Sequence, residues 1–248
     1  MKSWQVALAG ALGGAAIAGA VMFAVASSGR VPVSDAQLRY MLAHREAFTA
    51  VQERLLALQE EEDSAVYDKS AAAIKKAGTA IFFDPRIAFI TGPADAKTTF
   101  VEFYDYDCPF CRASLPVVHR YYQAHKHDTR FALIEFPLPT HGESAVLAAR
   151  ASLAARRQPD KYMAMHFALM SAKGTTDEQT ILDAAAKAGM DMEKLKADMK
   201  QPGLEKVLKD SQALAQRFGI RWTPAFVVNG NAHAGVLTEE GLTKLLEG

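Results

Sequence analysis

The sequence predicts an α/β fold, and two observations carry this prediction. Residues 98–104 and 130–136 are rich in β-branched and aromatic side chains, as buried strands are. The stretch between them, Pro109 to about His127, has a helical pattern, so the three segments predict a strand, helix, strand unit. Residues 143–200 are dominated by Ala, Leu, Met and Lys with helical periodicity, which predicts several further helices and no strand.

The first element is an apolar, Ala- and Gly-rich run from about Val6 to Val25. Lys2 precedes the run and an A-x-A sequence ends it, which is typical of an export signal over residues 1–27 that is cleaved. The run is also close to the roughly 20 residues that span a bilayer, so an uncleaved membrane anchor stays open, as does a buried core helix. A cleaved export signal and an uncleaved anchor both predict a periplasmic or otherwise exported protein.

Residues 34–77 predict a long helical region, because they are rich in Ala, Leu, Glu, Gln and Lys and contain no Pro or Gly. Ser34 suits the N-cap position. A narrow seam with spacings of three and four residues runs from Met41 to Leu58. Such a seam either packs on the rest of the chain or pairs with further copies. We favour a homo-oligomer formed through residues 35–77, with a trimer among the sizes this allows.

The remaining elements follow from breaks in the patterns. Residues 78–93 are predicted to be a linker with a short extended segment, 80–83, before Asp84-Pro85. Breaks inside the later helical stretch are expected at Gln158-Pro159, Lys173-Gly174 and Ala188-Gly189.

The C-terminal part is predicted to contain a helix, a hairpin and a second helix. The first helix restarts at Gln201-Pro202 and runs to about Phe218. The segments 224–228 and 232–236 then flank Asn229-Gly230, which is the preferred two-residue hairpin turn. The last predicted helix spans residues 239–247.

Charge and cysteine content narrow the range of possible functions. Twenty-eight basic residues balance twenty-eight acidic ones, so no overall field favours nucleic acid, which is not expected as a partner. The chain has two cysteines, both in the sequence Cys108-Pro109-Phe110-Cys111. A bridge across so short a loop removes little entropy from the unfolded chain, so stabilisation alone does not explain the pair.

The cysteine pair lies where thiol-disulfide exchange would need it. The attacking species is a thiolate, so a reactive cysteine must be partly exposed and have a lowered pKa. Cys108 falls where a strand leads into a helix, and the unpaired N–H groups and dipole of a helix start stabilise negative charge on sulfur. Pro109 suits the first helical position. Cys111, one turn later, is expected to be more buried and to resolve the disulfide that Cys108 forms.

Two other interpretations of the pair are weaker. A structural zinc site would need two more ligands, and neither a second cysteine pair nor closely paired histidines accompany the motif, so no metal is expected. An inert structural disulfide would not need the strand-to-helix position. No cofactor is therefore expected beyond the redox-active disulfide between Cys108 and Cys111.

Two further positions bear on the same site. Glu102 lies on the predicted strand six residues before Cys108, where burial would raise the pKa of its carboxyl group and let it exchange a proton with Cys111. A position at an edge facing water is the alternative. Thr223-Pro224 begins a predicted strand, where an X-Pro bond can be cis, and an ordinary trans proline is the alternative.

The segments FYDYDCPFC and RWTPAFVVNG, with the helical stretch between them, resemble the DsbA-like branch of the thioredoxin superfamily over about residues 80–248. The N-terminal helical region and the TPAFVV segment are similar to ScsC-type oligomeric thiol-disulfide oxidoreductases within that branch. The resemblance implies a thioredoxin fold with a helical insertion at about 143–200, preceded by an N-terminal helical stalk. Residues 78–248 would then form the catalytic domain.

The resemblance also assigns roles to single residues. It implies that Cys108 is the nucleophile, that Cys111 resolves the mixed disulfide, and that Pro224 is cis and lies beside the disulfide. Thr223 would offer backbone hydrogen bonds to a bound substrate strand. The residues expected to contact substrate are Thr223, Pro109 and Phe110.

One departure from the family pattern bears on the direction of the reaction. The strong oxidants of the family carry His where this chain has Phe110, and that His stabilises the reduced thiolate. Phe110 and the expected oligomer favour an isomerase or reductase that acts on exported, cysteine-containing client proteins and is recycled by a membrane redox partner. A monomeric DsbA-like oxidase and a Cu(I)-binding copper-tolerance protein stay open as alternatives.

Overall fold

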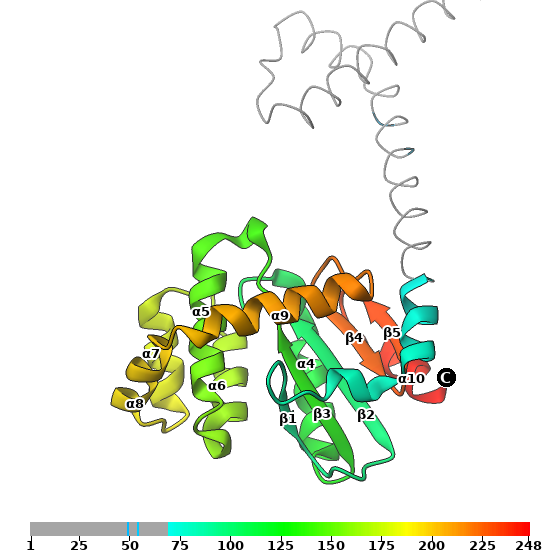
Figure 1. The fold of residues 1–248 in the computed structure, drawn as a ribbon, viewed down its shortest axis with the longest axis horizontal. Coiled ribbons are helices and arrows are strands. Elements are labelled where there is room, and N and C mark those ends of the chain that lie inside the picture. Colours follow the sequence, from blue (N-terminus) through cyan, green and yellow to red (C-terminus); the bar gives the residue numbers. More distant parts are fainter. Residues whose placement is uncertain (1–48, 50–53, 55–68) are drawn as a thin grey trace, which may run out of the picture. The chain divides into compact units, whose positions relative to one another are not determined.

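The computed structural model describes residues 49, 54 and 69–248, and residues 66–248 form one compact unit (Figure 1). The predicted export segment, 1–27, and most of the predicted helical region, 34–77, lie outside the described residues. Within the part that is described, no helix is long and apolar enough to cross a bilayer.

A five-stranded mixed sheet forms the centre of the unit, with strand order β1-β3-β2-β4-β5. The central strands β2 and β3 run parallel, and the other neighbours are antiparallel. Their bounds are Phe89–Thr91 (β1), Thr98–Tyr104 (β2), Thr129–Glu135 (β3), Ala225–Val228 (β4) and Asn231–Ala234 (β5). The α/β prediction and the strand at 98–104 are confirmed, and β3 begins one residue earlier than predicted.

Helices cover both faces of this sheet because β2 is apolar on both faces. Parallel strands need a crossover connection, and α4 (Pro109–His125) supplies it between β2 and β3. On one face, Phe100 of β2 packs with residues of α4 and of α10 (Glu239–Glu247). On the opposite face, Phe103 packs against α9 (Gly203–Arg217), which crosses in front of the sheet in Figure 1.

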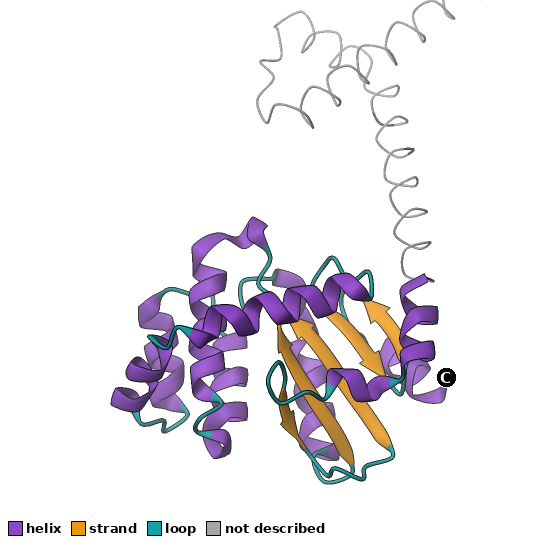
Figure 2. Ribbon diagram, in the orientation of Figure 1, coloured by secondary structure: helices purple, strands orange, loops and turns teal. Residues whose placement is uncertain are grey.

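The stretch between β3 and α9 contains helices joined by short loops and no strand, as the periodicity predicts. It contains α5 (Gly142–Ala155), α6 (Pro159–Met170), α7 (Glu178–Lys187) and α8 (Met192–Met199). Asp177 and Asp191 cap the last two helices by accepting backbone N–H groups, which explains where these helices begin. Figure 2 shows the four helices gathered beside the sheet. The thioredoxin fold with a helical insertion is therefore confirmed.

The predicted extended segment at 80–83 is wrong. Residues Thr79–Phe82 form a short 3-10 helix, η1. This turn places the Phe82 ring in the core, with ring centroids 5.8 Å from Phe103 and 5.1 Å from Phe218. Burial of one large aromatic side chain overrides the weak extended preference of a four-residue segment.

The predicted linker at 78–93 also contains a strand that the pattern did not reveal. In β1, Phe89 pairs antiparallel with Leu133 at the edge of the sheet. Three residues are too few to show the alternation by which strands are recognised. Gly92 ends this strand with φ +85°, and a Cβ there would lie 2.0 Å from the Thr129 carbonyl oxygen, so only glycine fits.

Residues 69–77 are helical, and the helix ends at Gly78, whose N–H donates to the Ile74 carbonyl at 2.9 Å. Ile74 is fully buried in the cluster that contains Phe82 and Phe103. The last turns of the predicted helical region therefore pack into the unit 66–248.

The C-terminal hairpin has the predicted turn. Asn229 and Gly230 have φ of 53° and 87°, the pair of positive values that a two-residue type I′ turn needs, and Val228 pairs with Asn231. The helix predicted to restart after Gln201-Pro202 is α9, and the helix predicted for 239–247 is α10.

Candidate active site

The two sequence motifs meet at one end of the sheet. Cys108 is the N-cap of α4, directly after the loop that leaves β2, and Pro109 is the first helical residue. The Thr223–Pro224 peptide bond is cis, and β4 begins at the next residue, beside β2. Thr223 thereby reaches Cys108 across 115 positions of sequence, and the Cys108 thiol donates to the Thr223 carbonyl oxygen at 3.1 Å.

The pKa of Cys108 is lowered to about 6. The largest cause is a hydrogen bond from the Cys111 thiol, and the backbone N–H groups of Cys111 and Phe110 at the helix start add to it, against the opposing effect of burial. Burial is the main reason that the pKa of Cys111 is raised well above its ordinary value, and the hydrogen bond with Cys108 and its charge add to this. One sulfur is thus a thiolate at neutral pH while the other keeps its proton.

The expectation of a partly exposed Cys108 is wrong, since the residue is only 2% exposed. The cis-proline loop covers it from the side of Thr223. Two large aromatic side chains beside it do face solvent: Phe110, inside the cysteine motif, is 57% exposed, and Trp222, next to Thr223, is 50% exposed. Trp222 is not among the site residues predicted from the sequence. Its position directly before Thr-Pro could have indicated it.

Glu102 is buried, with 2% exposure, and the alternative of a water-facing edge position is excluded because β2 lies between β3 and β4. Burial, and then the charge of Glu135, raises the pKa of Glu102 to about 8. The charge of Glu102 in turn contributes to the raised pKa of Cys111. A carboxyl group with a strongly raised pKa therefore lies within electrostatic reach of Cys111.

A polar cluster fixes the cysteine segment to the helical insertion. It was not predicted from the sequence. Asp107, the residue before Cys108, accepts hydrogen bonds from the Thr176 N–H and hydroxyl at 2.8 and 2.6 Å, and from the Ser144 hydroxyl at 2.6 Å. Arg112 pairs with Asp107 at 3.2 Å and donates to the Gly174 carbonyl at 2.6 Å. The sequence could have indicated this cluster, because Asp107 and Arg112 carry opposite charges on the two sides of the CPFC motif.

Asp107→Ala is expected to lower the free energy of unfolding by about 3 kcal/mol, because it leaves the partly buried Arg112 guanidinium without its charge partner. Chemical denaturation measures this loss, and hydrogen exchange is expected to speed up at Thr176. Asp95→Ala, at an exposed site, is the control and should change little. Equal losses in the two variants would contradict the structural role of Asp107.

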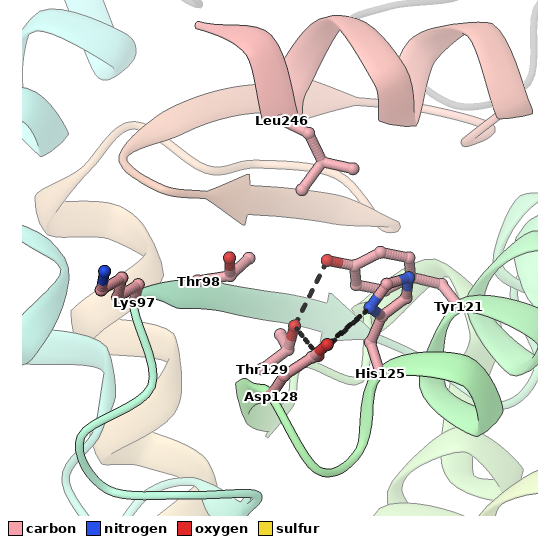
Figure 3. A pocket seen from close by; sticks show the side chains of 7 residues that line it. All are labelled: Lys97, Thr98, Tyr121, His125, Asp128, Thr129 and Leu246. Carbon is pink, nitrogen blue, oxygen red and sulfur yellow. Dashed lines mark hydrogen bonds and ion pairs between the residues drawn. The ribbon is translucent and has the colours of Figure 1, made fainter.

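A separate hollow lies at the opposite end of α4 and β2 (Figure 3). In it His125 pairs with Asp128 at 3.1 Å, and Tyr121 lies within hydrogen-bond distance of Thr129 at 3.4 Å. Its lining residues are Lys97, Thr98, Tyr121, His125, Asp128, Thr129 and Leu246. None of the predicted site residues is among them, so this hollow is not part of the cysteine site.

Known proteins resemble this chain over the unit just described. A family model described as Thioredoxin matches residues 87–248. A thioredoxin-like oxidoreductase from Silicibacter pomeroyi DSS-3 is 37% identical, with a TM-score of 0.60, over 68% of this chain and 94% of that one. Proteus mirabilis ScsC in a transitional conformation is 26% identical, with a TM-score of 0.61, over 87% of this chain and 95% of that one.

One curated relative is similar to this chain over only part of that relative's length. The Na(+)/H(+) antiporter NhaA of Herminiimonas arsenicoxydans is 29% identical over 164 residues, which are 66% of this chain. The match covers only 26% of that protein. This chain therefore spans about a quarter of the length of the curated relative it matches.

The family match covers most of the chain, and the two solved structures match 68% and 87% of it. The resemblance to DsbA-like proteins of the ScsC type is confirmed by these neighbours. This chain belongs to the thioredoxin family and has the fold of the thiol-disulfide oxidoreductases.

Proposed function

We propose that this chain is a thiol-disulfide isomerase or reductase that acts on exported, cysteine-containing proteins. The observation that carries the proposal is the contrast between the two thiols. Cys108, at the start of α4, has a pKa of about 6, whereas burial holds Cys111 in its protonated form. One sulfur is ready to attack, and the other is kept back until a mixed disulfide has formed.

The proposed reaction begins with attack of the Cys108 thiolate on one sulfur of a client disulfide. A Cys108–client disulfide forms, and the second client sulfur leaves as a thiolate. In isomerisation, another client thiolate attacks the client sulfur of this bond and releases Cys108 unchanged.

Reduction of the client follows a different second step. Cys111 passes its proton to the ionised Glu102 and attacks Cys108, so that the Cys108–Cys111 disulfide forms and the client sulfur leaves as a thiolate. The client gains two electrons and this chain is oxidised. A membrane redox partner that restores the dithiol is part of the proposal.

The pKa of Cys108 supports a moderate rather than an extreme oxidant. Its value of about 6 lies between about 7 for thioredoxin and about 3.5 for DsbA. A more stabilised thiolate makes the corresponding disulfide a stronger oxidant. The Phe110 side chain has no group that could donate to the Cys108 sulfur, which is consistent with this intermediate position.

The surface around the cysteines suits a partly unfolded client. Phe110 and Trp222 are exposed on the two segments that meet at Cys108, and an unfolded protein offers apolar side chains that can pack against them. Pro109 is exposed beside them, and Thr223 lies against the attacking sulfur. In the proposal, these four residues hold the client while its disulfides are exchanged.

The proposal includes a homo-oligomer formed through the N-terminal helical region. Several catalytic units on one particle would raise the concentration of Cys108 around a bound client. Ile74 packs into the unit 66–248, so a deletion that tests self-association should end at residue 65.

The exported chain is expected to reactivate a ribonuclease with scrambled disulfides and to sediment as an oligomer. A chain without residues 34–65 should sediment as a monomer and reactivate the ribonuclease more slowly, while still exchanging disulfides with glutathione. Phe110→His is the matched control for direction, since it should favour oxidation of reduced substrate over reactivation. Absence of reactivation by the oligomeric chain would remove the isomerase function, and insulin reduction would then test the reductase.

A further inference from the structure

Behind Glu102, the core holds a second buried carboxyl group that the proposed reaction does not use. We propose that Glu135, hydrogen-bonded by Tyr104, is a positioning residue that controls whether Glu102 is ionised when Cys111 must give up its proton. This inference rests on the proposed function, because it assigns Glu135 a role through Glu102.

The strand register brings these side chains to the same face of the sheet. Glu102 and Tyr104 are two residues apart on β2, so they point to the same side. On the parallel neighbour β3, Leu133 pairs with Glu102 and Glu135 pairs with Tyr104. Glu135 is therefore the diagonal neighbour of Glu102, and strand spacing and rise put their Cα atoms about 8 Å apart.

Neither carboxyl group is fully satisfied by the protein. Both residues are buried, and the Oε2 atoms of Glu102 and Glu135 make no hydrogen bond. The Tyr104 hydroxyl donates to Oε1 of Glu135. A buried carboxylate with an unpaired oxygen is costly, and two like charges on one buried face disfavour each other, so the pair holds at least one proton over a wide pH range.

Other groups face Glu135 from the elements packed on β3. The Tyr104 hydroxyl also lies 3.2 Å from the Ser152 hydroxyl of α5 and 2.9 Å from the Tyr162 hydroxyl of α6. Arg156, at the end of α5, lowers the pKa of Glu135 by its charge, and Asp105 raises it.

A second branch of the cluster starts from Tyr106, whose hydroxyl is 3.0 Å from both Ser152 and Nδ1 of His166. Burial lowers the pKa of His166 to about 3, so the ring stays neutral above that pH. Burial also raises the pKa of each of the three tyrosines, Tyr104, Tyr106 and Tyr162. Within this described cluster, Glu102 and Glu135 are thus the groups that change charge near neutral pH.

The order in which the two carboxyls ionise decides the state of the proton acceptor. Burial raises the pKa of both carboxyl groups, but the Tyr104 hydroxyl donates to Glu135 and the Arg156 charge also favours its ionised form, whereas Glu102 has no such stabilisation. Glu135 therefore ionises first, and its negative charge keeps the proton on Glu102. In the resolving step Cys111 needs an ionised Glu102, so Glu135 sets the pH at which this step becomes fast.

Two substitutions that act on Glu135 in different ways should have the same effect on Glu102. Glu135→Gln removes the facing charge, and Tyr104→Phe removes the donor that lets Glu135 ionise. Each should lower the ionisation midpoint of Glu102, by about one pH unit for Glu135→Gln, as expected for a charge about 8 Å away in a protein interior. Tyr121→Phe is the matched control, because its hydroxyl lies beside Thr129, at the other end of α4, rather than in the cluster around Glu135.

The test uses the full reduced chain with ¹³C-labelled glutamate, and the Glu102 side-chain signal is assigned by its loss in Glu102→Gln. The pH titration of that signal is measured together with the rate at which Cys111 releases a small thiol from a mixed disulfide on Cys108. We expect the Glu102 midpoint and the midpoint of the rate profile to move down together in Glu135→Gln and Tyr104→Phe, and to stay in place in Tyr121→Phe.

Unchanged Glu102 midpoints in both variants would overturn the inference, and Tyr104→Phe alone decides it if Glu135→Gln does not fold. A shifted titration with an unshifted rate profile would overturn the role in the resolving step. Complete absence of exchange in the wild-type chain would be a failure of the proposed function instead, since the titration of Glu102 is measured without any client.

Discussion

Cys108→Ser is expected to reduce thiol-disulfide exchange to the uncatalysed background, the largest effect of any single substitution in this chain. The Cys108 thiolate, with a pKa of about 6, is the predominant form at neutral pH, and a serine hydroxyl does not ionise there. Exchange of the wild-type chain with oxidised glutathione should fall about tenfold for each pH unit below the pKa, because protonation removes the attacking species. Stopped-flow kinetics from pH 4 to 9 measure both effects.

Cys111→Ser is the matched control, since it replaces a thiol of the same size one helical turn away. This variant should still attack but should not resolve, so mixed disulfides with client proteins should accumulate and be visible by mass spectrometry. The assignment of roles would be reversed if Cys111→Ser blocked the first attack while Cys108→Ser accumulated the adducts.

Glu102→Gln is expected to remove most of the loss of stability that the wild-type chain shows between acidic and alkaline pH. The pKa of Glu102 is raised from about 4.5 to about 8 on folding, so the folded state binds the proton more tightly than the unfolded state. The corresponding stabilisation is complete below the unfolded pKa and is lost as pH rises through 8. It amounts to about 5 kcal/mol by linkage.

The variant and the wild-type chain should exchange their order of stability with pH. At pH 5 the buried glutamine amide leaves one more donor unpaired than a protonated carboxyl group does, which costs about 1–3 kcal/mol. At pH 9 the wild-type chain must bury a charge and the variant does not, so the variant should be the more stable. Urea denaturation of the reduced proteins at the two pH values measures this crossing.

Glu143→Gln is the control for this experiment, because Glu143 is exposed at the start of α5 and should leave the pH dependence unchanged. Part of the slope should persist in Glu102→Gln, since Glu135 also has a raised pKa. An unaltered slope in Glu102→Gln would show that Glu102 does not carry the proton. The buried Glu102 carboxyl group destabilises the fold at alkaline pH. A role in proton transfer to or from Cys111, as proposed above, would explain why the fold keeps it.

Long elements with a strong pattern could be predicted from the sequence, and short ones could not. Strand β2 has β-branched and aromatic residues along most of its seven positions, and helix α9 has a helical pattern over fifteen, so packing only reinforces a local preference. The three residues of β1 and the four of η1 have too little pattern, and their structure depends on pairing with β3 and on burial of Phe82.

The same division applies to the cysteine site. The sequence by itself determined that Cys108 and Cys111 lie one turn apart at a helix start, that Pro109 can occupy the first turn, and that Glu102 lies on the preceding strand. These are local relations, set by the strand and helix geometry of one continuous segment.

Only the tertiary structure decided which distant groups complete the site. The contact of the Thr223 carbonyl with Cys108, the bonds of Asp107 to Thr176, and the position of Glu135 beside Glu102 all join segments separated by dozens of residues. Their geometry depends on the register of the sheet and on the docking of the helical insertion. Burial then raised the pKa of the CPFC motif's second thiol and of Glu102, because the cost of a buried charge depends on everything packed around it.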